Sequence, residues 1–273
     1  MMRRTREPLG LSAQRVTAMV LRYWYLLRSS WPRLLELIYW PAVQMLMWGF
    51  LQTYLAQTTS FAAKAAGLFI GAVLLWDILV RSQLGFAVAF LEEIWSRNLG
   101  HLMMSPLRPA ELVAALILVS LIKLLVAMVP VALLAYAFFG FNVLSLGVAF
   151  AFFFANLVMM SWSLGLISTG VVLRWGLGAE SFAWLIVFVF LPLCCVYYPV
   201  STLPSWLQTV ALALPPTYVF EGLRAIVLRG DFVGSLMVKA LALNAVYFAA
   251  GWATFAYFLQ SARITGPLVQ MGE

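Results

Sequence analysis

The chain has 273 residues, of which 64% are hydrophobic and only 10% are charged, and its mean hydropathy is +0.97. A soluble domain carries about 25% charged residues, so this composition excludes an ordinary soluble protein. Its long apolar runs, of about 20 residues each, favour membrane-spanning helices over the strands of about 10 residues that build a β-barrel. We therefore expect an all-α polytopic membrane protein, folded as one transmembrane domain over residues 1–273.

The first predicted element is an amphipathic helix over residues 11–31. Val16, Met19, Tyr23 and Leu27 share one face of it, and arginines and aromatic residues flank that face. This pattern is typical of a helix in the headgroup layer of a membrane, with a solvated linker as the alternative. The arginine-rich start has no uninterrupted apolar core and no small-residue cleavage site, so we do not expect a cleaved signal peptide.

Six transmembrane helices are predicted after this element. The expected spans are residues 37–56, 66–90, 112–139, 147–172, 181–198 and 236–260. Eleven of the seventeen lysines and arginines then fall on one side of the membrane, namely Arg3, Arg4, Arg6, Arg15, Arg22, Arg28, Arg33, Arg97, Arg108, Arg174 and Arg263. Because basic residues concentrate in cytoplasmic segments, we expect a multi-pass protein of the cytoplasmic (inner) membrane with both termini in the cytoplasm.

The segment 91–110, LEEIWSRNLGHLMMSPLRPA, is the only long polar interruption in the first two-thirds of the chain. Its spacing predicts a short amphipathic cytoplasmic helix over residues 91–104, which Pro106 and Pro109 would end. The apolar residues on one face are expected to pack against the spans, namely Leu91, Ile94, Trp95, Leu99 and Leu102. The polar residues are expected on the exposed face, namely Glu92, Glu93, Arg97 and His101.

The segment after the fifth predicted span is too polar at its start to cross a membrane and too apolar at its end for an ordinary loop. Pro204 and the Pro215-Pro216 pair break it, and Gly230 provides a helix terminator. Two short re-entrant helices over about residues 203–228 fit this pattern. A seventh span is the competing interpretation, but it would enclose Glu221 and Arg224.

The sequence contains no recognisable catalytic or metal-binding set. His101 is the single histidine, and no His-Glu-x-x-His pattern or serine with a plausible histidine partner occurs. His101 is therefore expected to be a surface residue rather than a catalyst. The phosphate-binding loop G-x-x-x-x-G-K-[ST] is also missing. We expect no enzyme activity, no metal and no cofactor in this chain, so any ATPase that powers it is a separate protein.

Charged residues lie within the second and third predicted spans. Asp77 and Arg81 are one helical turn apart in the second span, so they can form a structural ion pair or line a route through the membrane. Lys123 lies about midway along the third span. A buried charge in lipid needs a partner or water, so Lys123 is expected either to bind another helix or to contact an anionic substrate.

The residues just described resemble those of the ABC-2 type transporter permeases, including drug, Nod-factor and polysaccharide exporters, over nearly the whole chain. Glu93 to Pro106 is similar to an R-x-x-G-x-L … S-P-like stretch of that family. The segment from Tyr198 to Arg224, YPVSTLPSWLQTVALALPPTYVFEGLR, is similar to its P-x-S-x-L-P-x-W-L-Q … P-x-T … E/D-x-x-R signature. The matching residues expected in the re-entrant gate are Pro199, Ser201, Pro204, Trp206, Pro215, Thr217, Glu221 and Arg224.

The resemblance implies an exporter built from two permease chains, expected as a homodimer, with two ATP-binding subunits that hold ATP and magnesium. Residues 91–104 would then be the coupling helix, and an amphipathic or lipid-linked substrate would pass between the permeases. An ion-coupled secondary transporter is disfavoured because we find no inverted repeat and no lone carboxylate within a span. Two more candidate functions are a membrane enzyme that handles lipids and a non-transporting assembly subunit.

Overall fold

The computed structural model describes residues 9–58 and 67–265, and every regular element in these ranges is helical. The long helices are α1 (Leu9–Arg28), α2 (Trp31–Thr58), α4 (Leu68–Trp95), α6 (Pro109–Phe139), α7 (Val148–Trp175) and α11 (Gly234–Thr265). The shorter α-helices are α5 (Leu99–Met104), α8 (Ser181–Leu193), α9 (Ser205–Leu212) and α10 (Pro215–Arg229). Three 3₁₀ turns connect them, η1 (Val143–Leu146), η2 (Gly176–Ala179) and η3 (Val200–Thr202).

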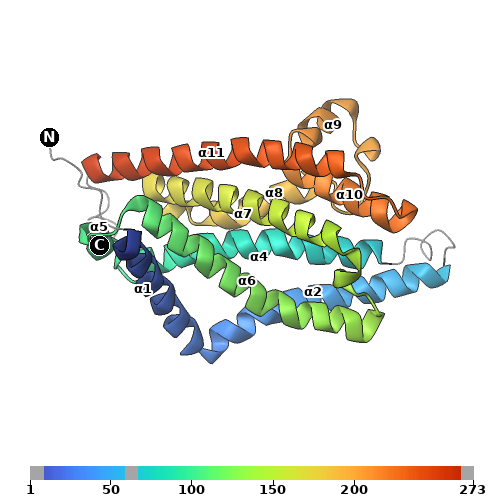
Figure 1. Ribbon diagram of the computed structural model, residues 1–273, viewed down its shortest axis with the longest axis horizontal. Coiled ribbons are helices and arrows are strands. Elements are labelled where there is room, and N and C mark those ends of the chain that lie inside the picture. Colours follow the sequence, from blue (N-terminus) through green and yellow to red (C-terminus); the bar gives the residue numbers. More distant parts are fainter. Residues whose placement is uncertain (1–8, 59–66, 266–273) are drawn as a thin grey trace.

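The long helices form an elongated bundle with distinct ends. Helices α2, α4, α6, α7 and α11 run along its long axis (Figure 1). Helices α1 and α5 lie at one end, which we call the α5 end, and α9 and α10 lie at the other, which we call the α10 end. Helix α4 occupies the centre, with most of its side chains buried by its neighbours.

Within the described residues, five helices are long and apolar enough to cross a membrane, namely α2, α4, α6, α7 and α11. Their bounds differ from the predicted spans by a few residues at most ends and by six at the start of α2. The predicted fifth span over residues 181–198 is wrong in extent. Helix α8 has only 13 residues, or about 20 Å at 1.5 Å per residue, less than the bilayer core of about 30 Å. It ends because Cys195 adopts a left-handed conformation with φ 53°.

Helices α9 and α10 are long and apolar enough to cross a membrane only if the two are counted as one helix. The chain bends by 98° at the break between them. Pro215 and Pro216 start α10 at positions where a helix tolerates proline, because the first amides of a helix have no internal acceptor. Gly230 ends α10 in the left-handed conformation, with φ 78°. Two short helices therefore occupy the segment for which a re-entrant pair was predicted.

Small residues let the long helices approach one another. A Cβ atom on Gly251 of α11 would lie 2.8 Å from the carbonyl oxygen of Ser163 in α7, and one on Gly85 of α4 would lie 3.3 Å from Cα of Ser120 in α6. Buried polar residues add a specific link, since Asn244 Nδ2 donates to the backbone and side-chain oxygens of Asn156, both at 3.0 Å. Close backbone contact and interhelical hydrogen bonds are the means by which helices associate in lipid.

Candidate functional site

The connection between α4 and α6 is a bent segment rather than one helix. Helix α4 continues to Trp95, Arg97 then adopts a left-handed conformation with φ 54°, and α5 contains only Leu99–Met104. The amide of Asn98 closes the turn by donating to the carbonyl of Glu93 at 2.9 Å. The prediction of a continuous helix over residues 91–104 is therefore wrong, because its first five residues belong to the second span and the polar run 96–98 turns the chain.

The bend changes which side chains are exposed. Arg97 and His101 are exposed, as predicted, and Leu99 and Leu102 are buried, also as predicted. Two other expectations are reversed, since Glu93 is only 1% exposed and Trp95 is 49% exposed. The prediction assumed an isolated surface helix, whereas residues 91–95 extend a helix that α1 and α6 cover.

Glu93 joins the connection to α1. Its carboxylate accepts hydrogen bonds from Arg22 Nη1 and from Asn98 Nδ2, both at 2.7 Å. One turn before Glu93 on α4, the carbonyl of Ala89 accepts a hydrogen bond from the Tyr23 hydroxyl at 3.2 Å. Burial raises the pKa of Tyr23, and the carboxylate of Glu93 raises it further, so the phenol keeps its proton and stays a donor.

A second contact joins α1 to the other side of α5. Arg15 Nη1 donates to the carbonyl of Pro106 at 3.0 Å and lies 3.7 Å from Glu111 Oε1 at the start of α6. On the opposite face of the connection, Trp95 Nε1 donates to Glu180 Oε2 at 3.0 Å, just before α8. The segment around α5 is thus fastened to α1 at both of its ends and to α8 at one. A displacement of this segment would therefore act on both α1 and α8.

Glu92 lies on another side of α4, between two cations. Its Oε1 atom is 3.6 Å from Lys123 Nζ of α6 and 3.8 Å from Arg33 Nη1 of α2. Lys123 is 7% exposed, so its charge is held within the protein. Of the two roles expected for Lys123, the ion pair with another helix is present, and the distances leave room for further contacts.

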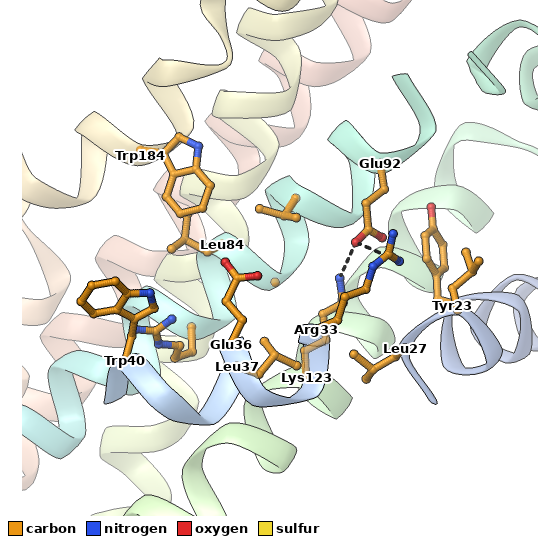
Figure 2. Close-up of a pocket in the computed structure, with 14 residues that line it drawn as sticks. Tyr23, Leu27, Arg33, Glu36, Leu37, Trp40, Leu84, Glu92, Lys123 and Trp184 are labelled. Carbon is orange, nitrogen blue, oxygen red and sulfur yellow. Dashed lines mark ion pairs between the residues drawn. The ribbon is translucent and has the colours of Figure 1, made fainter. Parts of the chain in front are cut away.

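Beside this cluster is a cavity of about 180 Å³ between α1, α2, α4, α6 and α8 (Figure 2). Half of its lining residues are leucine, valine or tryptophan. The charged residues that line it are Arg33, Glu36, Arg81, Glu92 and Lys123. Charged and apolar groups therefore meet in one hollow at the α5 end of the bundle.

The arrangement of Asp77 and Arg81 differs from a simple ion pair. In the described part of the chain, no contact within 4.0 Å joins their charged atoms. Asp77 is 1% exposed and its Oδ2 atom has no hydrogen-bond partner among the described residues; the same holds for Arg81 Nε. Arg81 points to the cavity wall, one turn closer than Asp77 to the α5 end. Arg81 is a lining residue of the cavity and Asp77 is not, and the second expected role, in which the two residues line a route through the membrane, stays a prediction.

At the α10 end, Glu221 and Arg224 of α10 bind the backbone of residues 195–200. Arg224 is 7% exposed and donates to the carbonyls of Cys195 at 2.8 Å and Val196 at 3.4 Å, and it pairs with Glu221 at 3.1 Å. Glu221 also accepts from the amide of Val200 at 2.9 Å. The two charges thus hold the chain that leaves α8.

The remaining predicted gate residues divide into a buried and an exposed set. Pro215 and Thr217 are buried, and the Thr217 hydroxyl donates to the carbonyl of Ala211 at 2.7 Å, which fixes the bend between α9 and α10. Four others lie exposed on the surface, namely Pro199, Ser201, Pro204 and Trp206. The gate residues therefore lie in one segment of the fold, with part of them buried and part exposed.

Sequence reasoning missed the roles of Arg22, Arg33, Trp40 and Trp184. Arg22 and Arg33 entered only the prediction of membrane orientation, although each pairs with a glutamate of the α4 terminus. A signal was present, because Glu92 and Glu93 close a buried span and need cationic partners. Arg22 and Arg33 belong to the basic residues that were expected on the same side of the membrane as that segment.

Taken together, the five long apolar helices, the bent pair at one end and the polar connection at the other define a multi-pass helical membrane protein. The model of the ABC-2 type transporter family matches residues 17–228, from within α1 to the last turn of α10. The chain therefore belongs to the ABC-2 type transporter family. No match was found among curated individual proteins.

Membership of this family identifies the chain as the membrane component of an ABC transporter. Such a component lacks a nucleotide-binding domain of its own and works with an ABC ATP-binding subunit.

Proposed function

We propose that the chain is the permease subunit of an ATP-driven exporter in the cytoplasmic membrane, with the α5 end facing the cytoplasm. The distribution of arginine supports this orientation, because α1, which carries Arg15, Arg22 and Arg28, and the turn around α5 lie at the same end. The transported substrate is amphipathic or lipid-linked. Two copies of the chain form a homodimer, and two ATP-binding subunits, which hold ATP and magnesium, dock beneath it.

The observation that carries the proposal is the exposed turn around α5 in a chain of this family. Arg97 and His101 project from it, whereas Leu99 and Leu102 anchor it to the bundle. We assign docking of the ATP-binding subunit to Arg97 and His101. Glu92 and Glu93, which the sequence pattern placed on the same face, instead tie the turn to α1, α2 and α6.

These contacts would couple ATP binding in the partner subunit to movement of the membrane helices. A movement of α5 on ATP binding would displace α4 directly, and it would pull α1 through Arg15 and Arg22. The contact of Trp95 with Glu180 extends the same movement to α8. At the other end, the α9–α10 pair dips into the membrane from outside and closes the exit, held by Glu221 and Arg224. Rigid elements between two discrete states are sufficient for such a transition.

The proposal is tested by purifying the tagged permease in detergent, together with its co-expressed ATP-binding subunit, and reconstituting the complex. We expect stoichiometric co-purification and ATP hydrolysis that amphipathic compounds stimulate. Transport by the permease alone, driven by a proton or sodium gradient, would contradict the proposal and favour a secondary transporter.

A further inference from the structure

The cavity at the α5 end has a polar side and an apolar side. Figure 2 shows Arg33, Glu92 and Lys123 together at one side, and Trp40 and Trp184 at the other. Three cationic and two acidic side chains line the whole cavity, so its walls carry an excess of positive charge. A concave site with this division fits a ligand that has an anionic part and an apolar part.

The ion pairs of the two cations on the polar side are long. Lys123 and Arg33 share a single oxygen of Glu92, at 3.6 and 3.8 Å, whereas a charge-assisted hydrogen bond is about 2.8 Å long. Arg81, whose Nε atom is buried without a hydrogen-bond partner among the described residues, also lines the cavity. Since a buried charge is costly unless it is paired, an additional group with several acceptor oxygens would be stabilised here.

The apolar side opens onto the lateral surface of the bundle. Trp40 is 58% exposed and Trp184 is 42% exposed, although both line the cavity. The cavity volume of about 180 Å³ leaves room for a phosphate group beside the charged side chains. A ligand that fills both sides must therefore place its head inside and its chain along the tryptophans, toward the surrounding bilayer.

We propose that this cavity binds the phosphate-bearing head of an amphiphile, with Lys123 and Arg33 at its oxygen atoms and its apolar chain between Trp40 and Trp184. The amphiphile is the cargo, held in the cytoplasmic leaflet before export. This inference rests on the proposed function and specifies the substrate class. Glu92 keeps the two cations in place while the cavity is empty and releases part of their charge to the phosphate when the head enters.

The test uses a phosphatidic acid with a photoreactive diazirine in its acyl chain, added to the permease–ATPase complex in nanodiscs without nucleotide. We expect cross-links to peptides that contain Trp40 and Trp184, and about tenfold less labelling for Lys123→Gln, since a hydrogen bond between charged groups has this effect on binding. Lys123→Arg keeps the charge and should retain most labelling. Lys239→Gln, at an exposed lysine of α11, is the matched control.

Equal labelling of the wild type and Lys123→Gln would overturn the proposal, and so would equal labelling by a photoreactive diacylglycerol, which has no phosphate. Arg33→Gln is a second variant, for the case that Lys123→Gln does not fold. It is expected to fold because the Arg33 side chain is 47% exposed. It should reduce labelling in the same direction while leaving the thermal unfolding midpoint unchanged. Unreduced labelling of a folded Arg33→Gln variant would contradict the assigned role of Arg33.

Two further arms identify the source of the phosphate and the fate of the ligand. An excess of inorganic phosphate should not displace the probe if the ligand is a lipid, and complete displacement would overturn the assignment to a lipid. Addition of MgATP should lower labelling, because cargo then leaves the cavity, and unchanged labelling would refute the cargo role. Labelling of the permease without its ATP-binding subunit separates lipid binding in the cavity from the proposed exporter function. Lipid binding needs Lys123 but no ATP-binding subunit.

Discussion

The two ends of the bundle are stabilised by different kinds of polar contact. At the α5 end, charges far apart in the sequence meet, as with Arg22 and Glu93, which are 71 residues apart. At the α10 end, the contacts span shorter stretches and mostly join a side chain to a backbone carbonyl, as with Thr217 and Ala211, only six residues apart. The longest of these links Arg224 to Cys195, 29 residues apart.

This difference indicates different mechanical roles. Ion pairs between separate helices can break and form again as helices move, so the α5 end can transmit a displacement from one helix to the next. Side-chain bonds to the backbone preserve a local shape, so the α10 end can move as a closed unit. The following substitutions test this contrast, in order of decreasing expected effect.

The largest loss of stability is expected for Arg224→Ala at the α10 end. The substitution leaves two buried carbonyls without a donor and deprives Glu221 of its cation. Removal of one partner of a buried pair typically costs about 3 kcal/mol. Thermal unfolding in detergent should show the loss, and Arg229→Ala, at an exposed position of the same helix, should show none. An unchanged midpoint for Arg224→Ala would mean that this end is not held as described.

A smaller effect is expected for Glu93→Ala at the α5 end. Arg22 is partly exposed and can turn to water, with its side chain 38% accessible, so we expect a cost of about 1.5 kcal/mol. The main consequence is local, because α1 loses its link to α4. Hydrogen exchange should therefore accelerate in α1 while α7 and α11 stay protected.

A double-mutant cycle makes this second prediction specific. Arg22→Ala should produce the same local exchange, and adding it to Glu93→Ala should produce little more. Arg28→Ala, at an exposed position of the same helix, is the control. Fully additive effects of Arg22→Ala and Glu93→Ala would indicate that the pair does not connect α1 to α4.

The smallest effect is expected for Trp95→Phe, which removes the donor to Glu180 and keeps most of the ring. Trp95 is exposed, so the hydrogen bond should contribute only about 0.5 kcal/mol to stability. Coupling is the more sensitive readout, and substrate-stimulated ATP hydrolysis should fall while basal hydrolysis is retained. A stability loss as large as that of Glu93→Ala would show that this contact is structural instead.

Local sequence patterns were enough to predict much of the fold. Apolar length predicted the helices that cross the membrane, and proline spacing predicted the break before Pro215. Glu221 and Arg224, which belong to the signature segment singled out in the sequence, pair at 3.1 Å. Each of these features depends on residues that are close along the chain.

Features that depend on distant residues were not predictable in this way. The burial of Glu93 depends on Arg22 of another helix, and the cavity requires α2, α4 and α6 to meet around Glu92. The end of α8 depends on the backbone conformation of Cys195, with φ 53°, in a run that reads as continuous apolar helix. A hydropathy pattern does not show which residues of other helices contact a given side chain. Charged residues near the end of a span are the signal in the sequence that such a partner exists.

The most direct test of the central claim is a charge reversal on the exposed face of the turn around α5. The variant carries Arg97→Glu and His101→Glu, and Arg229→Glu at the α10 end is the control. If this face docks the ATP-binding subunit, the variant keeps the wild-type unfolding midpoint and loses co-purification of that subunit, whereas the control keeps both. Stoichiometric co-purification with undiminished substrate-stimulated ATP hydrolysis in the double variant would contradict the account.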